Sequence, residues 1–390
     1  MKCIYCLKDK SEDKFSLEHI VPQFLGGSYA PANFKTRAVC RRCNSNLGLF
    51  VDGIFARDFL IGWHLREIDS LNIDESKDCD YTLPLICMGK VENISFEETP
   101  EDYICESWLG PFGEQVYWIR PHDLSKESYI GGNPIDINKK QSTIYYFLNE
   151  KSTKHLNLVL NSFLDFESKN KNIRKILCAD VHDNVGKLIK VKGFDDRNEL
   201  DKTRIDNFYD RKDENIRGSI CLSYLQSRRF LAKLAIGLIS VLYENPYETL
   251  SRDYSKVLYD FMWLHPNNTE GINVLGGEDP EVGLNKFTSI KNCVSLLLMP
   301  TNEGLSYVLN LGGKKCYVIK VTDDINGLEI TNSKILILNK NLMKSVYIDF
   351  EDFVSWRLGK IANKNLDELI RIAKGSEKLL KELRKELPTK

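Results

Sequence analysis

Two short cysteine pairs constrain the fold of this 390-residue chain more than any other feature of its sequence. Each pair has the pattern Cys-x-x-Cys, and the four members are Cys3, Cys6, Cys40 and Cys43. This spacing brings both thiolates of a pair within reach of one metal ion, and two such pairs complete the tetrahedral site typical of zinc. A closed four-thiolate site leaves no position for water, so we expect this zinc to be structural and the reacting groups to lie elsewhere.

Candidate reacting groups lie between the two cysteine pairs and directly after the second one. They are Glu18, His19, Asn33 and Asn44, and the stretch from 18 to 27 also contains a proline and two adjacent glycines. The order and spacing of these residues resemble the HNH endonuclease family, with its ββα-metal motif, over about the first 60 residues. The resemblance implies a β-hairpin bound to zinc, followed by a helix that begins at about Arg41.

The resemblance also implies a role for each of these residues. His19 would be the general base that activates water against a phosphodiester, because an imidazole titrates near neutral pH. Glu18 and Asn44 match the positions that hold a catalytic divalent cation, Mg²⁺ or Mn²⁺, which would stabilise the leaving oxygen. Asn33 matches the central asparagine, which would pin the turn that orients the histidine loop.

Two departures from the family pattern leave a second interpretation open. Glu18 stands where the family usually has aspartate, and Ser45 follows Asn44 where a lysine is often found. These differences are compatible with a non-catalytic zinc-ribbon module that binds nucleic acid or protein. The two interpretations differ in whether activity requires a divalent cation in addition to zinc.

Charge is balanced over the whole chain, with a net charge of −1, but the N-terminal part is basic. Residues 1–66 contain ten Lys/Arg against six Asp/Glu. The basic residues that flank the candidate site are Lys35, Arg37, Arg41 and Arg42. We expect them to contact the phosphates of DNA, with RNA as the alternative, since basic side chains supply the sequence-independent part of such binding. A homodimer or a partner protein of a defence system is the other expected partner.

The sequence favours a cytoplasmic protein. No apolar run approaches the ~20 residues that a membrane span needs, and the chain starts Met1-Lys2-Cys3, which leaves no room for a signal peptide. The cysteines outside the two pairs are scattered singly among apolar residues, as in proteins of a reducing compartment. The chain is also similar to bacterial HNH endonucleases of anti-phage systems, which implies a defence role with the C-terminal region controlling or targeting the cut.

The rest of the chain predicts an α+β fold with mostly antiparallel strands. We expect an HNH module over residues 1–68, a strand-rich region over 69–214, and a regulatory, sensing or partner-binding α+β region over 215–390. Further expected elements are short strands that include 81–88 and 156–160, a long apolar helix over 220–243, an antiparallel meander over 293–321, and an amphipathic helix over 365–387.

Overall fold

The computed structural model describes residues 1–76, 80–92, 98–121, 141–166, 172–182, 185–210, 218–219, 224–263, 276–278 and 283–385. The chain forms two compact units. Unit 1 consists of Met1–Ala56, Glu67–Glu75 and Ser223–Glu377, and unit 2 consists of Arg57–Arg66, Ser76–Leu222 and Lys378–Lys390. The N-terminal residues thus belong to the same unit as most of the C-terminal region. The division into three consecutive segments stays a prediction.

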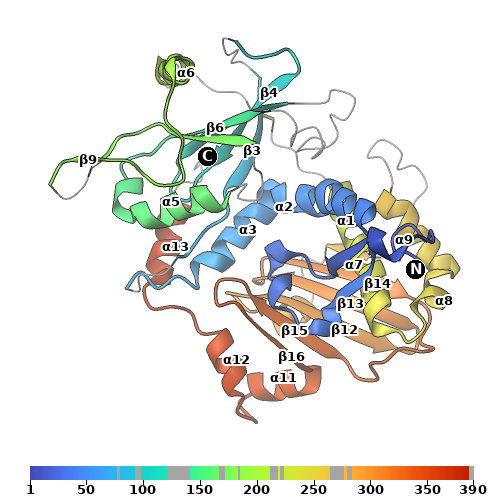
Figure 1. Ribbon diagram of the computed structural model, residues 1–390. Helices are drawn as coiled ribbons and strands as arrows, with labels where there is room; N and C mark the ends of the chain where they lie inside the picture. The colour runs from blue at the N-terminus through green and yellow to red at the C-terminus, as the bar shows by residue number, and fades with distance from the viewer. Residues whose placement is uncertain are drawn as a thin grey trace. The chain divides into compact units, whose positions relative to one another are not determined.

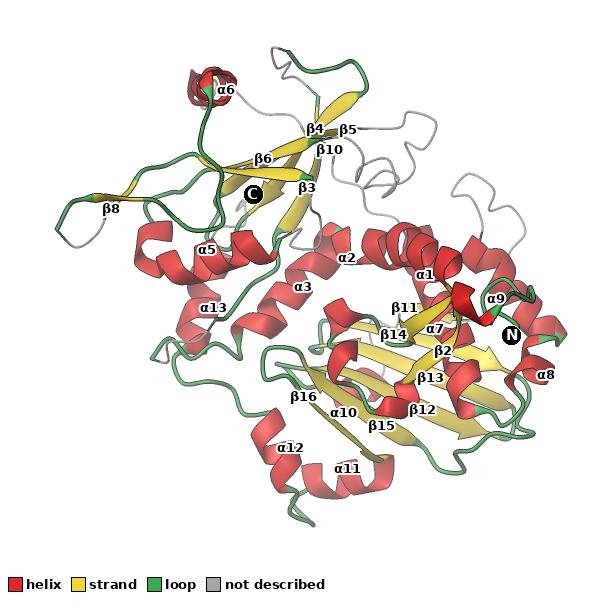
Figure 2. Ribbon diagram, in the orientation of Figure 1, coloured by secondary structure: helices red, strands yellow, loops and turns green. Residues whose placement is uncertain are grey.

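Unit 1 begins with two strands and a helix. Strand β1 (Phe15–His19) pairs antiparallel with β2 (Lys35–Cys40), and helix α1 (Arg41–Leu47) follows directly, as expected (Figure 2). A π-helical turn, η5 (Gly48–Gly53), then leads into the chain's next helices. Their bounds are Ile54–Arg57 for α2 and Phe59–Ser70 for α3. The expected hairpin and the helix from Arg41 are therefore confirmed.

The main sheet of unit 1 is antiparallel throughout its described pairs, with the strand order β11-β14-β13-β12-β15-β16 (Figure 1). Its strands are β11 (Gly276–Glu278), β12 (Val294–Thr301), β13 (Gly304–Leu311), β14 (Lys315–Thr322), β15 (Lys334–Asn339) and β16 (Lys344–Asp349). Consecutive strands β12, β13 and β14 are neighbours, which confirms the meander expected over 293–321.

Helices pack against this sheet because its strands are apolar on both faces. They are α7 (Tyr224–Leu242), α8 (Pro246–Leu250), α9 (Asp253–Trp263), α10 (Gly283–Thr288), α11 (Phe350–Arg357) and α12 (Lys364–Leu369). Val308 belongs to a buried cluster with Phe353 of α11 and Leu366 of α12. Its neighbour Tyr307, which projects from the other face, donates its hydroxyl to the Leu231 carbonyl of α7 at 2.9 Å. Successive residues of β13 thus serve two different cores.

The expected long apolar helix over 220–243 is not borne out. The helix at this position, α7, carries two charged residues that are almost fully buried, Arg229 and Lys233. A buried charge needs a partner, so these residues point to a polar role within the fold rather than to an apolar core helix. Among the described residues, no helix is long and apolar enough to cross a membrane.

Unit 2 is built on a sheet with the order β10-β3-β4-β5-β6-β7. Its strands are β3 (Ile86–Val91), β4 (Tyr103–Leu109), β5 (Gln115–Pro121), β6 (Ser142–Tyr146), β7 (Ile173–Leu177) and β10 (Gly218–Ser219), and a separate small hairpin pairs β8 (Val181–His182) with β9 (Leu188–Ile189). Strands β6 and β7 are parallel and are connected through helix α5 (Leu156–Asp165). The strand expected over 156–160 is therefore wrong. Val159 and Phe163 are buried four residues apart, which is the spacing of a helix face.

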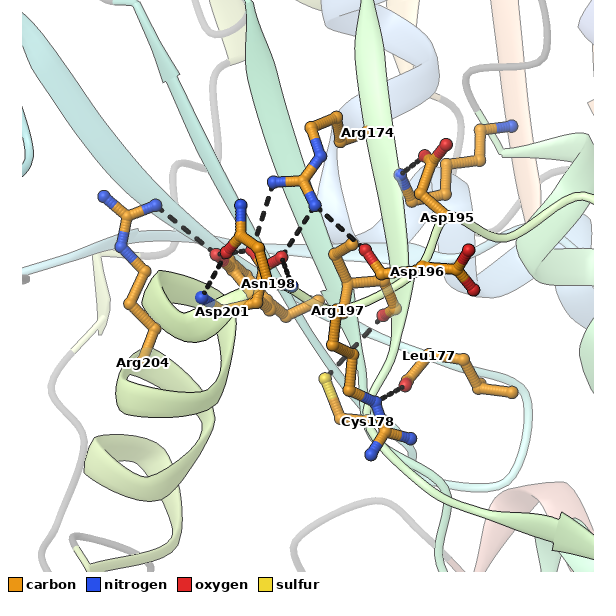
Figure 3. Close-up of polar contacts among 12 residues, drawn as sticks. Arg174, Leu177, Cys178, Asp195, Asp196, Arg197, Asn198, Asp201 and Arg204 are labelled. Carbon is orange, nitrogen blue, oxygen red and sulfur yellow. Dashed lines mark hydrogen bonds and ion pairs between the residues drawn. The ribbon is translucent and has the colours of Figure 1, made fainter. Parts of the chain in front are cut away.

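Helix α6 (Glu199–Asp210) of unit 2 is fixed by a polar network that Figure 3 shows. The Asn198 side chain accepts from the Asp201 N–H at 2.8 Å, and the Asp201 side chain accepts from the Asn198 N–H at 2.8 Å. This reciprocal pair is a capping box, which satisfies donors at the helix start. Arg174 of β7 also donates to Asp201 at 2.6 Å, so the cap ties α6 to the sheet.

The expected tail helix over 365–387 is two helices. One is α12, and the other is α13 (Ser376–Arg384). Ile370 is the C-cap of α12, and Gly375, which directly precedes α13, has a φ of +88°, a left-handed conformation that glycine adopts without strain.

Candidate active site and zinc site

The four cysteines of the two pairs gather at one point of unit 1. The sulfur atoms of Cys3, Cys6, Cys40 and Cys43 all lie within 4.8 Å of one another. Zinc bonded to four thiolates at about 2.3 Å requires sulfur–sulfur distances of about 3.8 Å, so the cluster fits the ion after small adjustments. The donor set is the one that structural zinc prefers, and it leaves no open position for water.

Backbone hydrogen bonds hold the two cysteine pairs together. The Ile4 N–H donates to the Ala38 carbonyl of β2 at 2.9 Å, and the Cys40 N–H donates to the Cys3 sulfur at 3.3 Å. A hydrogen bond within the cluster, from the Cys43 thiol, lowers the pKa of Cys3 to about 4. Lys10 donates its ammonium group to the Cys40 sulfur at 2.9 Å, which adds a positive charge beside the thiolates.

Strand β1 carries Glu18 and His19 on opposite faces, because successive side chains of a strand alternate. Glu18 is buried, with 5% exposure, whereas His19 is half-buried. The loop after His19 is tightly packed at Gly27, where a Cβ atom would lie 1.6 Å from the Val21 carbonyl oxygen. Only glycine fits there, so the loop that follows the histidine has a defined shape.

Asn44 connects α1 to β1. Its side-chain amide nitrogen donates to the Ser16 hydroxyl at 3.0 Å and to the Leu17 carbonyl at 2.9 Å. The N-cap of α1 is Cys40, so Asn44 lies inside the helix rather than at its cap. Both of these hydrogen bonds use Nδ2, and Oδ1 accepts none from the part of the chain that the structure describes. Asn44 therefore offers a hard oxygen close to the strand that ends in His19.

Glu18 is engaged inside unit 1. Its Oε1 atom lies 2.9 Å from the Lys233 ammonium nitrogen and accepts from the Tyr5 hydroxyl at 3.2 Å. The Lys233 ammonium also pairs with Asp52. A buried carboxylate already balanced by an ammonium group fits a second cation poorly, because the ion would have to compete with Lys233. The expected cation-binding pair, Glu18 with Asn44, does not fit as it stands, although Asn44 alone does.

The remaining predicted site residues lie at or near the surface. Asn33 is exposed in the short 3-10 turn η4 (Ala32–Phe34). Arg37 and Arg42 are exposed cations, Lys35 donates to the Ser28 carbonyl at 2.9 Å, and Arg41 donates to the Phe15 carbonyl at 3.4 Å. Lys35 and Arg41 thus stabilise the loop and hairpin as well. Their contacts with nucleic acid stay a prediction.

Sequence reasoning missed the groups that surround Glu18. The side chain of Asp52 is 14% exposed and paired with Lys233, a burial that its neighbours in the sequence do not indicate. One signal was present. Lys233 interrupts the apolar run Phe-Leu-Ala-Lys-Leu-Ala-Ile, and a lysine in such a run needs a buried partner or a path to solvent.

Comparison with known proteins identifies the N-terminal segment. Residues 3–60 match the family model described as HNH endonuclease, which confirms the resemblance. The matched segment contains the cysteine cluster together with Glu18, His19, Asn33 and Asn44. No curated protein matches the chain, and no solved structure does. The match supports a nuclease-type domain at the start of the chain.

Proposed function

We propose that this protein is a metal-dependent HNH endonuclease that hydrolyses the phosphodiester bonds of DNA, with His19 as the general base. The observation that carries the proposal is the matched ββα segment, in which the cysteine cluster fixes one end of the hairpin. Asn44 binds the same strand at Ser16 and Leu17, close to His19 in the sequence. A candidate base, a candidate oxygen donor and a four-cysteine cluster that could hold zinc support the proposal.

The role proposed for His19 follows from the proton that the reaction must move. Water attacks a phosphodiester efficiently only if a base removes its proton, and a neutral imidazole nitrogen is suited to this near pH 7. His19 is half-buried at the end of β1, so its ring is held by the strand and still reaches solvent. Such a base contributes a factor of about 10²–10⁴ to the rate.

A divalent cation, Mg²⁺ or Mn²⁺, supplies charge stabilisation at the leaving oxygen when it is bound. The Oδ1 atom of Asn44 is the protein group that we propose for it, since Mg²⁺ takes few protein oxygens and keeps several waters. Glu18 as a second ligand stays a prediction from the resemblance. Its buried ion pair with Lys233 supports a different role.

DNA is proposed as the substrate because the exposed cations Arg37 and Arg42 lie on β2 and α1, the elements that also carry the candidate site. Guanidinium groups bind phosphate oxygens through paired hydrogen bonds. Cleavage of RNA, assembly as a homodimer, a role in antiviral defence, and control or targeting by the C-terminal region stay predictions.

The proposal is tested by incubating supercoiled plasmid with purified protein in Mg²⁺ or Mn²⁺, beside a structured RNA of similar length. We expect His19→Ala to lower the rate of DNA cleavage by about 10²-fold or more. His182→Ala is the matched control, because His182 is an exposed histidine of unit 2 outside the matched segment. Equal cleavage by the two variants, or no cleavage by the wild type, contradicts the proposal.

The alternative is a zinc-ribbon module that binds nucleic acid or protein without cutting. The pairing of Glu18 with Lys233 favours it, since one expected cation ligand is already occupied. This alternative predicts that nucleic acid binds with unchanged affinity when Mg²⁺ is removed and that His19→Ala has no effect.

A further inference from the structure

Four side chains form a buried ionic cluster beside the candidate active site: Tyr5, Glu18, Asp52 and Lys233. They come from the first cysteine pair, strand β1, the π-helical turn η5 and helix α7 of unit 1. The Lys233 ammonium group lies at the centre. It contacts both carboxylates and sits 5.8 Å from the centroid of the Tyr5 ring. The cluster therefore joins the first cysteine pair, β1 and η5 to helix α7 of the C-terminal region.

Electrostatics make Lys233 essential to this arrangement. The ammonium group is 2% exposed, and burial alone would favour its neutral form. Asp52 and Glu18 outweigh that effect, so the pKa of Lys233 lies above its usual value. The cluster contains two carboxyl groups and one ammonium group, and Asp52 Oδ1 has no hydrogen-bond partner among the described residues. Without Lys233, two carboxyl groups would share a buried site, which is unfavourable.

Helix α7 approaches β1 too closely for its position to be incidental. At Gly237 a Cβ atom would meet the Ile20 side chain at 2.9 Å, and Ile20 directly follows His19. One turn before Lys233, the Phe230 ring stacks on Phe55 with centroids 4.0 Å apart. The helix thus packs on the Ile20 side chain, directly after His19, while Lys233 pairs with Glu18, directly before it.

The π-helical turn η5 supplies the second carboxylate. A π-helical turn interrupts the regular hydrogen-bond pattern of a helix and often marks a functional position. Here the turn follows α1 directly, and it places Asp52 against Lys233, eight residues after Asn44. Lys233 therefore contacts both the strand that carries His19 and the segment that continues from the Asn44 helix.

We infer that Lys233 is a positioning residue for the active site, and that Glu18 is its anchor rather than a ligand of the catalytic cation. The inference rests on the proposed nuclease function. Lys233 fixes the relative placement of β1 and η5, and through them of His19 and Asn44. The N-terminal segment is accordingly incomplete without α7, and the catalytic cation is held without the charge of Glu18.

The test compares Glu18→Gln, Lys233→Met and the double variant in the full chain. Lys256→Met is the matched control, because Lys256 also pairs with an aspartate of unit 1, Asp253, but on the surface. The measured quantities are kcat on plasmid DNA, the Mn²⁺ concentration at half-maximal rate, and Mn²⁺ binding followed by electron paramagnetic resonance. All are measured below the onset of unfolding, and Glu18→Gln preserves the shape of the cluster should Lys233→Met fail to fold.

We expect Lys233→Met to lower kcat by about 10²-fold, as small displacements of catalytic groups do. The half-saturating Mn²⁺ concentration should stay within about twofold of the wild type in every folded variant, because no cation ligand is lost. The double variant should regain part of the lost kcat, since Glu18 is then no longer left buried without a partner. Lys256→Met should behave like the wild type.

Two results would overturn the inference. The first is a rise of about tenfold or more in the half-saturating Mn²⁺ concentration for Glu18→Gln, with tighter Mn²⁺ binding in Lys233→Met. Glu18 would then be a cation ligand and Lys233 its competitor. The second is a kcat of Lys233→Met equal to that of Lys256→Met, which would leave Lys233 without a positioning role.

Failure of the proposed function gives a different pattern. If the wild type cuts neither DNA nor RNA, the nuclease proposal fails, and with it the positioning role. The anchor role of Glu18 is still tested by Mn²⁺ binding and by urea unfolding. Glu18→Gln and Lys233→Met should shift the unfolding midpoint by less together than the sum of their separate shifts, and additive shifts would contradict the anchor.

Discussion

The stacked rings of Phe55 and Phe230 provide a quantitative test of the way in which the N-terminal segment joins helix α7. Phe230 is fully buried, and the centroid of its ring lies 4.0 Å from that of Phe55 and 6.0 Å from that of Phe24. Replacing Phe230 by alanine removes a large apolar side chain and leaves a cavity between these elements. Its two aromatic neighbours would each lose a face of contact.

The expected cost is about 4 kcal/mol, within the range of about 3–5 kcal/mol for buried phenylalanine replaced by alanine. That is a large part of the roughly 5–15 kcal/mol by which domains are stable. Phe55→Ala should cost a similar amount. Because the rings contact each other directly, the double variant should cost about 1 kcal/mol less than the sum of the single changes.

Urea unfolding followed by circular dichroism measures these free energies. Phe287→Ala is the control, because Phe287 is a 55% exposed phenylalanine of unit 1 and its loss should cost no more than about 0.5 kcal/mol. The reasoning is refuted if Phe230→Ala costs no more than this control. Additive costs for Phe55 and Phe230 would likewise contradict direct stacking.

Three further predictions concern zinc, the histidine loop and acid stability. Cys40→Ser should lower the bound zinc, measured by mass spectrometry, and unfold the first cysteine pair; retention of one full equivalent would contradict the four-cysteine site. Gly27→Ala should lower cleavage and the melting temperature together, because the new Cβ atom would clash with the Val21 carbonyl oxygen, and unchanged values would be contrary to the packing described. For Asp201, burial alone would raise the pKa, but the hydrogen bonds from Arg174, the Asn198 N–H and Tyr145, together with the charge of Arg174, outweigh burial, and the pKa lies below its usual value. A carboxyl group with a lowered pKa contributes stability that is fully present above its ordinary pKa and is lost as the pH falls through the lowered value. Asp201→Asn removes this contribution, so the free energy of unfolding should fall less steeply as the solution is acidified.

Much of the N-terminal segment follows from its sequence. The cysteine spacing predicts a metal cluster because two residues between ligands leave little conformational freedom, and the four sulfur atoms do gather. The resemblance to the HNH family implies a hairpin followed by a helix, which the structure contains. These features depend on residues that lie a few positions apart, and such spacings can be read directly from the sequence.

The environment of Glu18 could not be predicted in the same way. Lys233 lies 215 positions further along the chain, and no local pattern specifies which distant helix meets a given strand. The adjacent side chains of Glu18 and His19 read together as one active-site pair, although strand alternation sends them to opposite faces. A buried lysine in a helix indicates that a partner exists but does not identify it.

Two further helical regions were predicted incorrectly from their charge and hydrophobicity patterns. The segment around Asp201 is dense in charged residues, a pattern that suggests an exposed segment, yet it contains helix α6 with a buried face. Its aspartate is buried because Arg174 and the capping box satisfy it. In the tail, a continuous amphipathic pattern predicts one helix, whereas the structure has two, α12 and α13, separated by residues 370–375.

The most direct test of the central claim is a crystal structure of the His19→Ala chain with duplex DNA and Mn²⁺, with the ion located by its anomalous signal. We expect a phosphodiester between position 19 and Asn44, the ion within ligand distance of Asn44 Oδ1, and Lys233 still paired with Glu18. DNA bound away from β1 and α1, or an ion seated on other residues, would contradict it.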